Sequence, residues 1–111
     1  MGKSTTKYIV IFITASSYEE AHKISEALVS QKKAACVNIV PKVNSIFTWK
    51  DKLEEAEESL LIVKTRTKLF QDVVTLVKWL HSYEVPEIIA LPIIEGNPDY
   101  LEWIDKETGE K

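Results

Sequence analysis

The sequence of 111 residues has little of what several classes of protein depend on. Its single cysteine, Cys36, excludes an internal disulfide framework and makes a reducing cytoplasm the expected location. With only three glycines it has no glycine-rich phosphate loop, so we expect no organic cofactor. No apolar run approaches the ~18 residues that span a membrane. The net charge is -3, and without a basic block we expect no nucleic-acid partner.

What is present is a succession of strand and helix patterns that fits one domain. Ser17 and Glu20 have the capping-box spacing that begins a helix, and Asn97 followed by Pro98 begins another. Pro41 is expected at an edge strand or a bend, because proline cannot donate to a sheet ladder. The predicted elements, in order, are a strand (7–14), a helix (18–31), two strands (34–49 and 53–65) joined by a turn at 50–52, a helix capped by Thr65 or Thr67 (to about 80), a strand (88–94) and a short helix (99–106).

This β-α-β-β-α-β order predicts the ferredoxin-like arrangement of the α+β class. Four strands would form one antiparallel sheet with two helices on one face, and a short C-terminal helix would follow. We expect a single domain over residues 1–111, with flexible ends at 1–6 and 107–111.

The two central strands are too long for one small domain. At ~3.3 Å per residue the strand over 34–49 would reach ~50 Å, whereas a domain of this size has a radius of gyration of ~13 Å. The outer half of the hairpin carries Ile46, Phe47, Trp49 and Leu53. Either the strands bend at Pro41, or the hairpin is solvated on a monomer, or another subunit covers it. We expect a symmetric oligomer in which hairpins pair between chains.

The richest segment for chemistry runs from His81 to Glu87, between the second long helix and the last strand. A neutral imidazole is a common ligand for copper and zinc, although a histidine at a helix end also binds backbone carbonyls. Glu84 and Glu87 are candidate oxygen ligands or residues of a solvated turn. Cys36 is a soft ligand suited to copper, or a packed core residue.

A second group of residues is expected to line a cleft between subunits. Lys64 and Glu58 would form a buried pair, contact an anion, or make a plain cross-strand ion pair. Four aromatic side chains would line the cleft or simply pack at the interface: Tyr83, Trp49, Tyr100 and Trp103. No histidine or cysteine pair has metal-ligand spacing, so one chain offers at most two or three ligands. No nucleophile motif is present, and we expect no enzyme, although a cleft with His81, Tyr83 and Glu87 would permit acid–base chemistry.

Taken together, these residues resemble the CutA family, the divalent-cation tolerance proteins. The resemblance runs from about Tyr8 to Ile104. The stretches that carry it are 34–41 (AACVNIVP), 45–49 (SIFTW) with Leu53 and Glu54, 62–65 (IVKT), 81–89 (HSYEVPEII) and 96–103 (GNPDYLEW). It implies a ferredoxin-like homotrimer whose long hairpins complete sheets between subunits, and which binds Cu²⁺ or other divalent metals. Such trimers are also similar to the PII-type signalling proteins.

The chain departs from the family pattern at three positions. Ser82 stands where the family usually has proline, and Ile13 and Leu80 stand where some bacterial relatives carry a cysteine and a second histidine. The first hypothesis is therefore a cytoplasmic homotrimer that binds copper mainly through His81, helped by Cys36 or Glu87, and that contributes to metal tolerance. The alternative is a PII-like regulatory module that binds a small anionic effector or a protein partner in the clefts between subunits.

Overall fold

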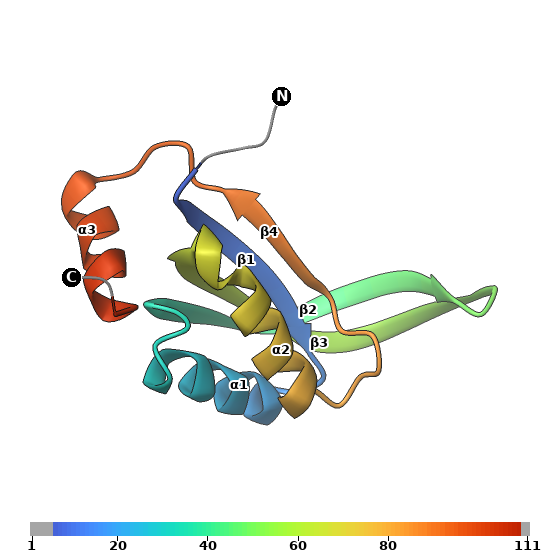
Figure 1. Cartoon of the computed structure of the whole chain (residues 1–111). Coiled ribbons are helices and arrows are strands. Elements are labelled where there is room, and N and C mark those ends of the chain that lie inside the picture. Colours follow the sequence, from blue (N-terminus) through green and yellow to red (C-terminus); the bar gives the residue numbers. More distant parts are fainter. Residues whose placement is uncertain (1–5, 110–111) are drawn as a thin grey trace.

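A computed structural model describes residues 6–109 and confirms the predicted order of elements (Figure 1). Both long strands and both long helices lie within a few residues of their expected bounds. The elements are β1 (Tyr8–Ala15), α1 (Tyr18–Ser30), β2 (Cys36–Trp49), β3 (Lys52–Arg66), the short 3-10 helix η1 (Thr67–Leu69), α2 (Phe70–Leu80), β4 (Ile88–Pro92) and α3 (Pro98–Glu107).

The strands form one antiparallel sheet in the order β2-β3-β1-β4, which is the expected ferredoxin-like topology. Helices α1 and α2 cover one face of this sheet (Figure 1). Alternate residues of β1, including Ile11 and Ile13, point to that face and pack with Ile24 of α1 and Val77 of α2. Apolar side chains at strand and helix spacing therefore supply most of the main core, which Leu61 and Val63 of β3 complete together with Ala34.

The opposite face of the sheet is also apolar, but it is only partly covered. Val10 and Phe12 of β1 are half-buried there, and Ile89 and Leu91 of β4 are about half exposed. Within the described residues, α3 contacts one end of this face, where the Arg66 guanidinium donates to Thr108. The continuous apolar run of β1 predicted burial on both faces; in the single chain one face is fully buried and the other only in part.

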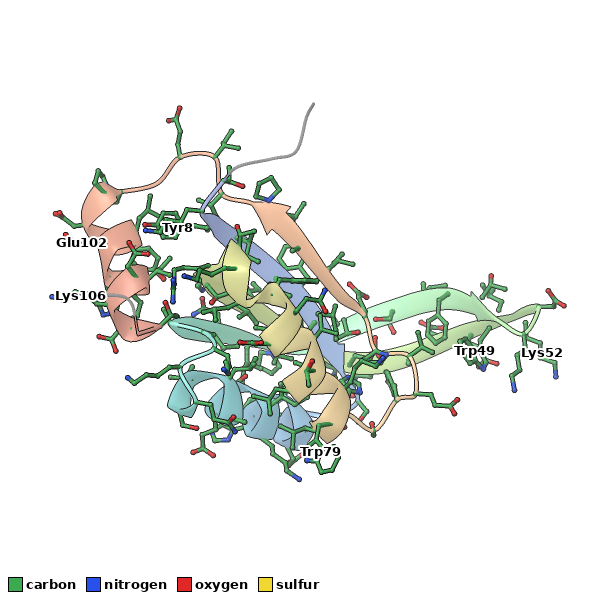
Figure 2. The ribbon with its side chains drawn as sticks, viewed as in Figure 1. Tyr8, Trp49, Lys52, Trp79, Glu102 and Lys106 are labelled. Carbon is green, nitrogen blue, oxygen red and sulfur yellow. The ribbon has the colours of Figure 1, made fainter. Side chains whose placement is uncertain are left out.

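The hairpin of β2 and β3 extends beyond the rest of the sheet (Figure 1). The ladder of β1 with β3 ends at the pair Ala15–Ser59, whereas β2 and β3 stay paired as far as Trp49 and Lys52. Trp49 and Lys52 lie at the far end of the hairpin in Figure 2. β2 is an edge strand, where a proline is tolerated, and its pairing shifts between Val40 and Val43, next to Pro41.

The beginning of helix α2 differs from expectation. Helix α2 has no side-chain cap, so the prediction that Thr65 or Thr67 caps it is wrong. The Thr65 hydroxyl donates to the Lys33 carbonyl (2.6 Å) and the Thr67 hydroxyl to the Thr6 carbonyl (2.7 Å), which ties down neighbouring segments instead.

The predicted flexible ends fall largely on residues 1–5 and 110–111, outside the described part. Thr108 is buried against Arg66, a contact that the sequence did not predict. Among residues 6–109, no helix has the length and apolar character needed to cross a membrane.

Candidate functional site

His81 ends helix α2 and its side chain is completely shielded from solvent. The ring nitrogen Nε2 lies 2.7 Å from the Thr14 carbonyl oxygen, at the end of β1. The other nitrogen, Nδ1, accepts the backbone N–H of Tyr83 at 3.0 Å. A carbonyl can only accept and an amide can only donate, so this pattern requires a neutral imidazole with its proton on Nε2. Nδ1 therefore carries the in-plane lone pair of the ring, and this lone pair accepts the hydrogen bond from the Tyr83 amide.

Glu20, from the first turn of α1, lies beside the same imidazole. Its Oε1 is 3.8 Å from His81 Nδ1 and accepts from the Ser16 amide (2.8 Å) and hydroxyl (2.9 Å). Its Oε2 accepts from the Ser82 amide at 2.7 Å. Burial alone would raise the pKa of the Glu20 carboxyl, but the hydrogen bonds from Ser16 and Ser82 outweigh it and hold the pKa below its ordinary value. The carboxylate is thus ionised, pre-oriented and close to an imidazole nitrogen.

Tyr83 connects this group to the hairpin. Its hydroxyl donates to Glu58 Oε2 (2.7 Å), and the Ser45 hydroxyl donates to Glu58 Oε1 (2.6 Å). Glu58 is a buried carboxylate on β3, and burial of the phenol together with this hydrogen bond raises the pKa of Tyr83 to about 12. We refer to Ser16, Glu20, Glu58, His81, Ser82 and Tyr83 as the His81 cluster. It joins β1, α1, β3 and the segment 82–87 that leads into β4.

Cys36 and Lys64 lie away from this cluster, at opposite positions on the neighbouring strands β2 and β3. Both are on the sheet face that α1 and α2 leave uncovered. The Lys64 ammonium donates to Asn38, so it does not pair with Glu58 as one of the sequence hypotheses had it. On β1, Lys64 faces Val10, four residues from the Thr14 that binds His81. Four residues of strand are ~13 Å, so Cys36 and His81 of one chain are too far apart to share a metal ion.

Tyr100 and Trp103 of α3 lie at the Cys36 end of the sheet, with ring centroids 5.4 Å apart. Partial burial, together with the proximity of the Cys36 thiol, raises the pKa of Tyr100 above its ordinary value. Trp49 is exposed near the hairpin tip, and Glu84 and Glu87 are exposed in the segment before β4. The residues expected to line one cleft are therefore spread over three regions of the single chain.

A complete metal site is not formed by the part of the chain that the structure describes. Residues 6–109 contain no group of three or more histidine, cysteine, aspartate or glutamate side chains that could hold an ion. Two suitable donors, His81 Nδ1 and Glu20 Oε1, lie 3.8 Å apart. Further ligands for a metal ion would have to come from water or from another subunit.

Sequence reasoning missed Glu20 as part of the site. Its spacing from Ser17 predicted only a capping box, and Ser17 does accept the Glu20 amide at 3.1 Å. The carboxylate, however, reaches Ser16 and Ser82 rather than the Ser17 amide. Nothing in the local pattern signals the contact with residue 82, because that contact depends on how α1 and α2 pack side by side.

Comparison with known proteins identifies the family. The family model of the CutA1 divalent ion tolerance protein matches residues 9–107. The divalent-cation tolerance protein CutA of Thermus thermophilus is 51% identical over 100 residues, covering 90% of this chain and 97% of that protein. The chloroplastic protein CutA 1 of rice is 43% identical over 107 residues, and those cover 96% of this chain but only 60% of the rice protein.

The solved structures agree with the sequence comparison. The structure of the divalent cation tolerance protein Cut A1 from Thermus thermophilus superimposes with a TM-score of 0.90 at 50% identity, covering 92% of this chain and 99% of that one. Identity of this level over nearly the whole domain goes well beyond a shared fold. The chain therefore belongs to the CutA1 divalent ion tolerance family.

Proposed function

We propose that this protein is a homotrimer that binds a divalent metal ion, copper foremost, and contributes to tolerance of divalent cations. Family membership over residues 9–107 is the observation that carries the proposal. The Thermus thermophilus relatives described above, from the sequence and the structure comparison, are named for tolerance of divalent cations rather than for a reaction. Their names lend no support to the PII-like alternative, and a binding role is favoured over catalysis. The cytoplasm stays the predicted location.

Two surfaces of the single chain support assembly. Ile46 is 65% exposed and Leu53 is 79% exposed on the outer half of the hairpin. The uncovered sheet face adds Ile89 and Leu91, each about half exposed. Exposed apolar surface on this scale, beside an unpaired strand edge, is typical of an interface between subunits. A cyclic trimer in which each hairpin packs on a neighbouring sheet would bury both surfaces together.

The donors of the chain suit copper or zinc better than calcium or magnesium. Imidazole nitrogen and thiolate sulfur favour the later transition metals, and Cu²⁺ binds most strongly in that series. His81 is the principal candidate, and the exposed Glu84 and Glu87 are free to approach a neighbouring subunit. Cys36 cannot join the His81 of its own chain, so its contribution would be a separate site or one across a subunit boundary.

Titration calorimetry of the metal-free protein with Cu²⁺ tests the proposal, with light scattering to give the mass of the assembly. We expect saturable binding at an integral number of ions per chain, weakened in His81→Gln and unchanged in His22→Gln, which alters the exposed histidine of α1. Cys36→Ser and Glu87→Gln would then locate the remaining ligands. Weak, non-integral binding that is the same in all variants would refute a dedicated metal site, and a monomeric mass would refute the trimer.

A further inference from the structure

We propose that a divalent metal binds between His81 Nδ1 and Glu20 Oε1 and that it displaces the Tyr83 amide, so that metal binding releases the segment 82–87. This inference rests on the proposed function and gives it a location and a mechanism. Glu20 becomes a metal ligand, which nothing in the sequence pattern suggested. The segment that carries Tyr83 becomes the part of the fold that responds to the metal.

The two donor atoms are already near the separation that a shared metal requires. Ligands at ~2.0–2.2 Å from a tetrahedral ion lie roughly 3.4 Å from each other. His81 Nδ1 and Glu20 Oε1 are 3.8 Å apart, so a shift of a few tenths of an ångström would suffice. The imidazole is fixed by its bond to the Thr14 carbonyl, and the carboxylate is fixed by Ser16. A histidine whose Nε2–H is held by a backbone carbonyl, as that of His81 is, has the outer-shell support typical of a metal ligand.

The Tyr83 amide and a metal ion compete for one lone pair. The Tyr83 N–H donates to His81 Nδ1 at 3.0 Å, and this nitrogen has a single lone pair with which to accept a proton or bind a metal. Both cannot use the same electrons, so the amide must move when a metal binds. Movement of this segment uncovers little of the core, because residues 82–85 and Glu87 are already exposed. The Ser82 amide, which donates to Glu20 Oε2, would be loosened with it.

Tyr83 carries the change to the hairpin. Its hydroxyl is bonded to the buried Glu58 of β3, so displacement of the Tyr83 backbone strains or breaks that contact. Metal binding and the Tyr83–Glu58 bond therefore oppose each other. Because linkage is reciprocal, weakening the bond must strengthen metal binding. Loss of a hydrogen bond to a charged carboxylate would tighten metal binding by roughly tenfold.

The first test is ¹⁵N nuclear magnetic resonance of the full chain during titration with Zn²⁺, which is diamagnetic and suits imidazole and carboxylate ligands. We expect His81 to show an unprotonated Nδ1 and a protonated Nε2 before metal is added. Zn²⁺ should then shift the Nδ1 resonance and the Tyr83 amide together, in proportion to the occupancy measured by calorimetry. The Nε2 proton should persist throughout.

Variants supply the second test. Glu20→Gln should weaken Zn²⁺ binding at least tenfold, while Glu19→Gln, which alters the exposed carboxylate next to it, should leave binding unchanged. Tyr83→Phe keeps the backbone amide but removes the hydroxyl, and it should bind Zn²⁺ roughly tenfold more tightly than the wild type. A Tyr83→Phe protein that binds more weakly would overturn the competition. If Tyr83→Phe does not fold, the Glu20 pair of variants decides the ligand.

The outcomes separate this inference from the proposed function. Saturable Zn²⁺ binding that leaves the His81 Nδ1 and Tyr83 amide signals unmoved would overturn the inference while the metal-binding function stands. Binding that moves both signals but is equal in Glu20→Gln and Glu19→Gln would remove Glu20 from the site. Absence of saturable binding of either Zn²⁺ or Cu²⁺ would overturn the inference and the function together.

Discussion

Replacing His81 by alanine should cost the fold about 3 kcal/mol, because this side chain is a structural link as well as a candidate ligand. The substitution removes the bonds to the Thr14 carbonyl and the Tyr83 amide. Each such bond contributes ~1 kcal/mol net. The imidazole is also fully buried, so its deletion leaves a cavity that adds at least ~1 kcal/mol. Against a typical total stability of ~5–15 kcal/mol this is a large loss.

Urea unfolding followed by far-ultraviolet circular dichroism measures this loss. The two proteins must be compared at the same chain concentration and in the presence of a chelator, because assembly and metal both shift apparent stability. His22→Ala is the matched control, since His22 is exposed on α1 and should change stability by less than ~0.5 kcal/mol. A drop in the midpoint at unchanged slope would give the free-energy difference directly.

A free energy of unfolding for His81→Ala within ~0.5 kcal/mol of that of the wild type would refute this prediction. That result would mean that the two hydrogen bonds are replaced by water at no cost, which a buried site does not allow. It would also remove the reason for assigning the proton to Nε2 and the lone pair to Nδ1.

Three further predictions follow from other contacts. Tyr83→Phe should remove from the ultraviolet phenol titration one tyrosine that ionises near pH 12, because burial and the bond to Glu58 raise the pKa of Tyr83 to about 12. Burial alone would raise the pKa of Asp105, but the hydrogen bonds from Tyr8 and Lys7 lower it below the usual 3.8. The ionised Asp105 therefore stabilises the fold above that pH, and this contribution is lost as the pH falls. Asp105→Asn should therefore flatten the acid end of the stability curve, measured by urea unfolding between about pH 5 and pH 2; an unchanged slope would contradict this. Leu53→Glu should dissociate the proposed trimer in sedimentation velocity, and Lys52→Glu, at the exposed tip beside it, should not.

The parts of the fold that the sequence predicts are those that local chemistry decides. Asn97 accepts the Asp99 amide with Pro98 at the first helical position, as the Asn-Pro pair predicts. Pro41 marks the edge strand because a proline has no N–H for a second ladder. Lys50 and Asp51 both adopt positive φ (52° and 67°) in the hairpin turn, a conformation that their sequence does not favour. There the pairing of two long strands overrides the local preference.

The site is harder to predict because its members are linked through the packing of distant elements. The candidate His81 is identified by its chemistry and by the family resemblance, yet its role as a donor to the Thr14 carbonyl depends on where α2 ends above β1. Glu20 and Ser82 are 62 positions apart and carry no shared motif. Glu58 and Lys64, both predicted on the same strand, were candidates for a buried pair, but each has a different partner.

The place of Glu58 gives the His81 cluster a significance beyond local stability. Going outward along the hairpin, β3 pairs with β1 as far as Ser59. Glu58 is therefore the first residue of the part of the hairpin that projects beyond the sheet. From that point outward, among the described residues, only β2 pairs with β3. The hydrogen bonds that Tyr83 and Ser45 donate to Glu58 therefore lie at the base of the projecting part of the hairpin. The outer half of the hairpin carries the exposed apolar residues proposed to join subunits. A change at His81 would therefore act on the element proposed to hold the assembly together. The proposed metal site and the proposed interface are thus coupled through one tyrosine side chain.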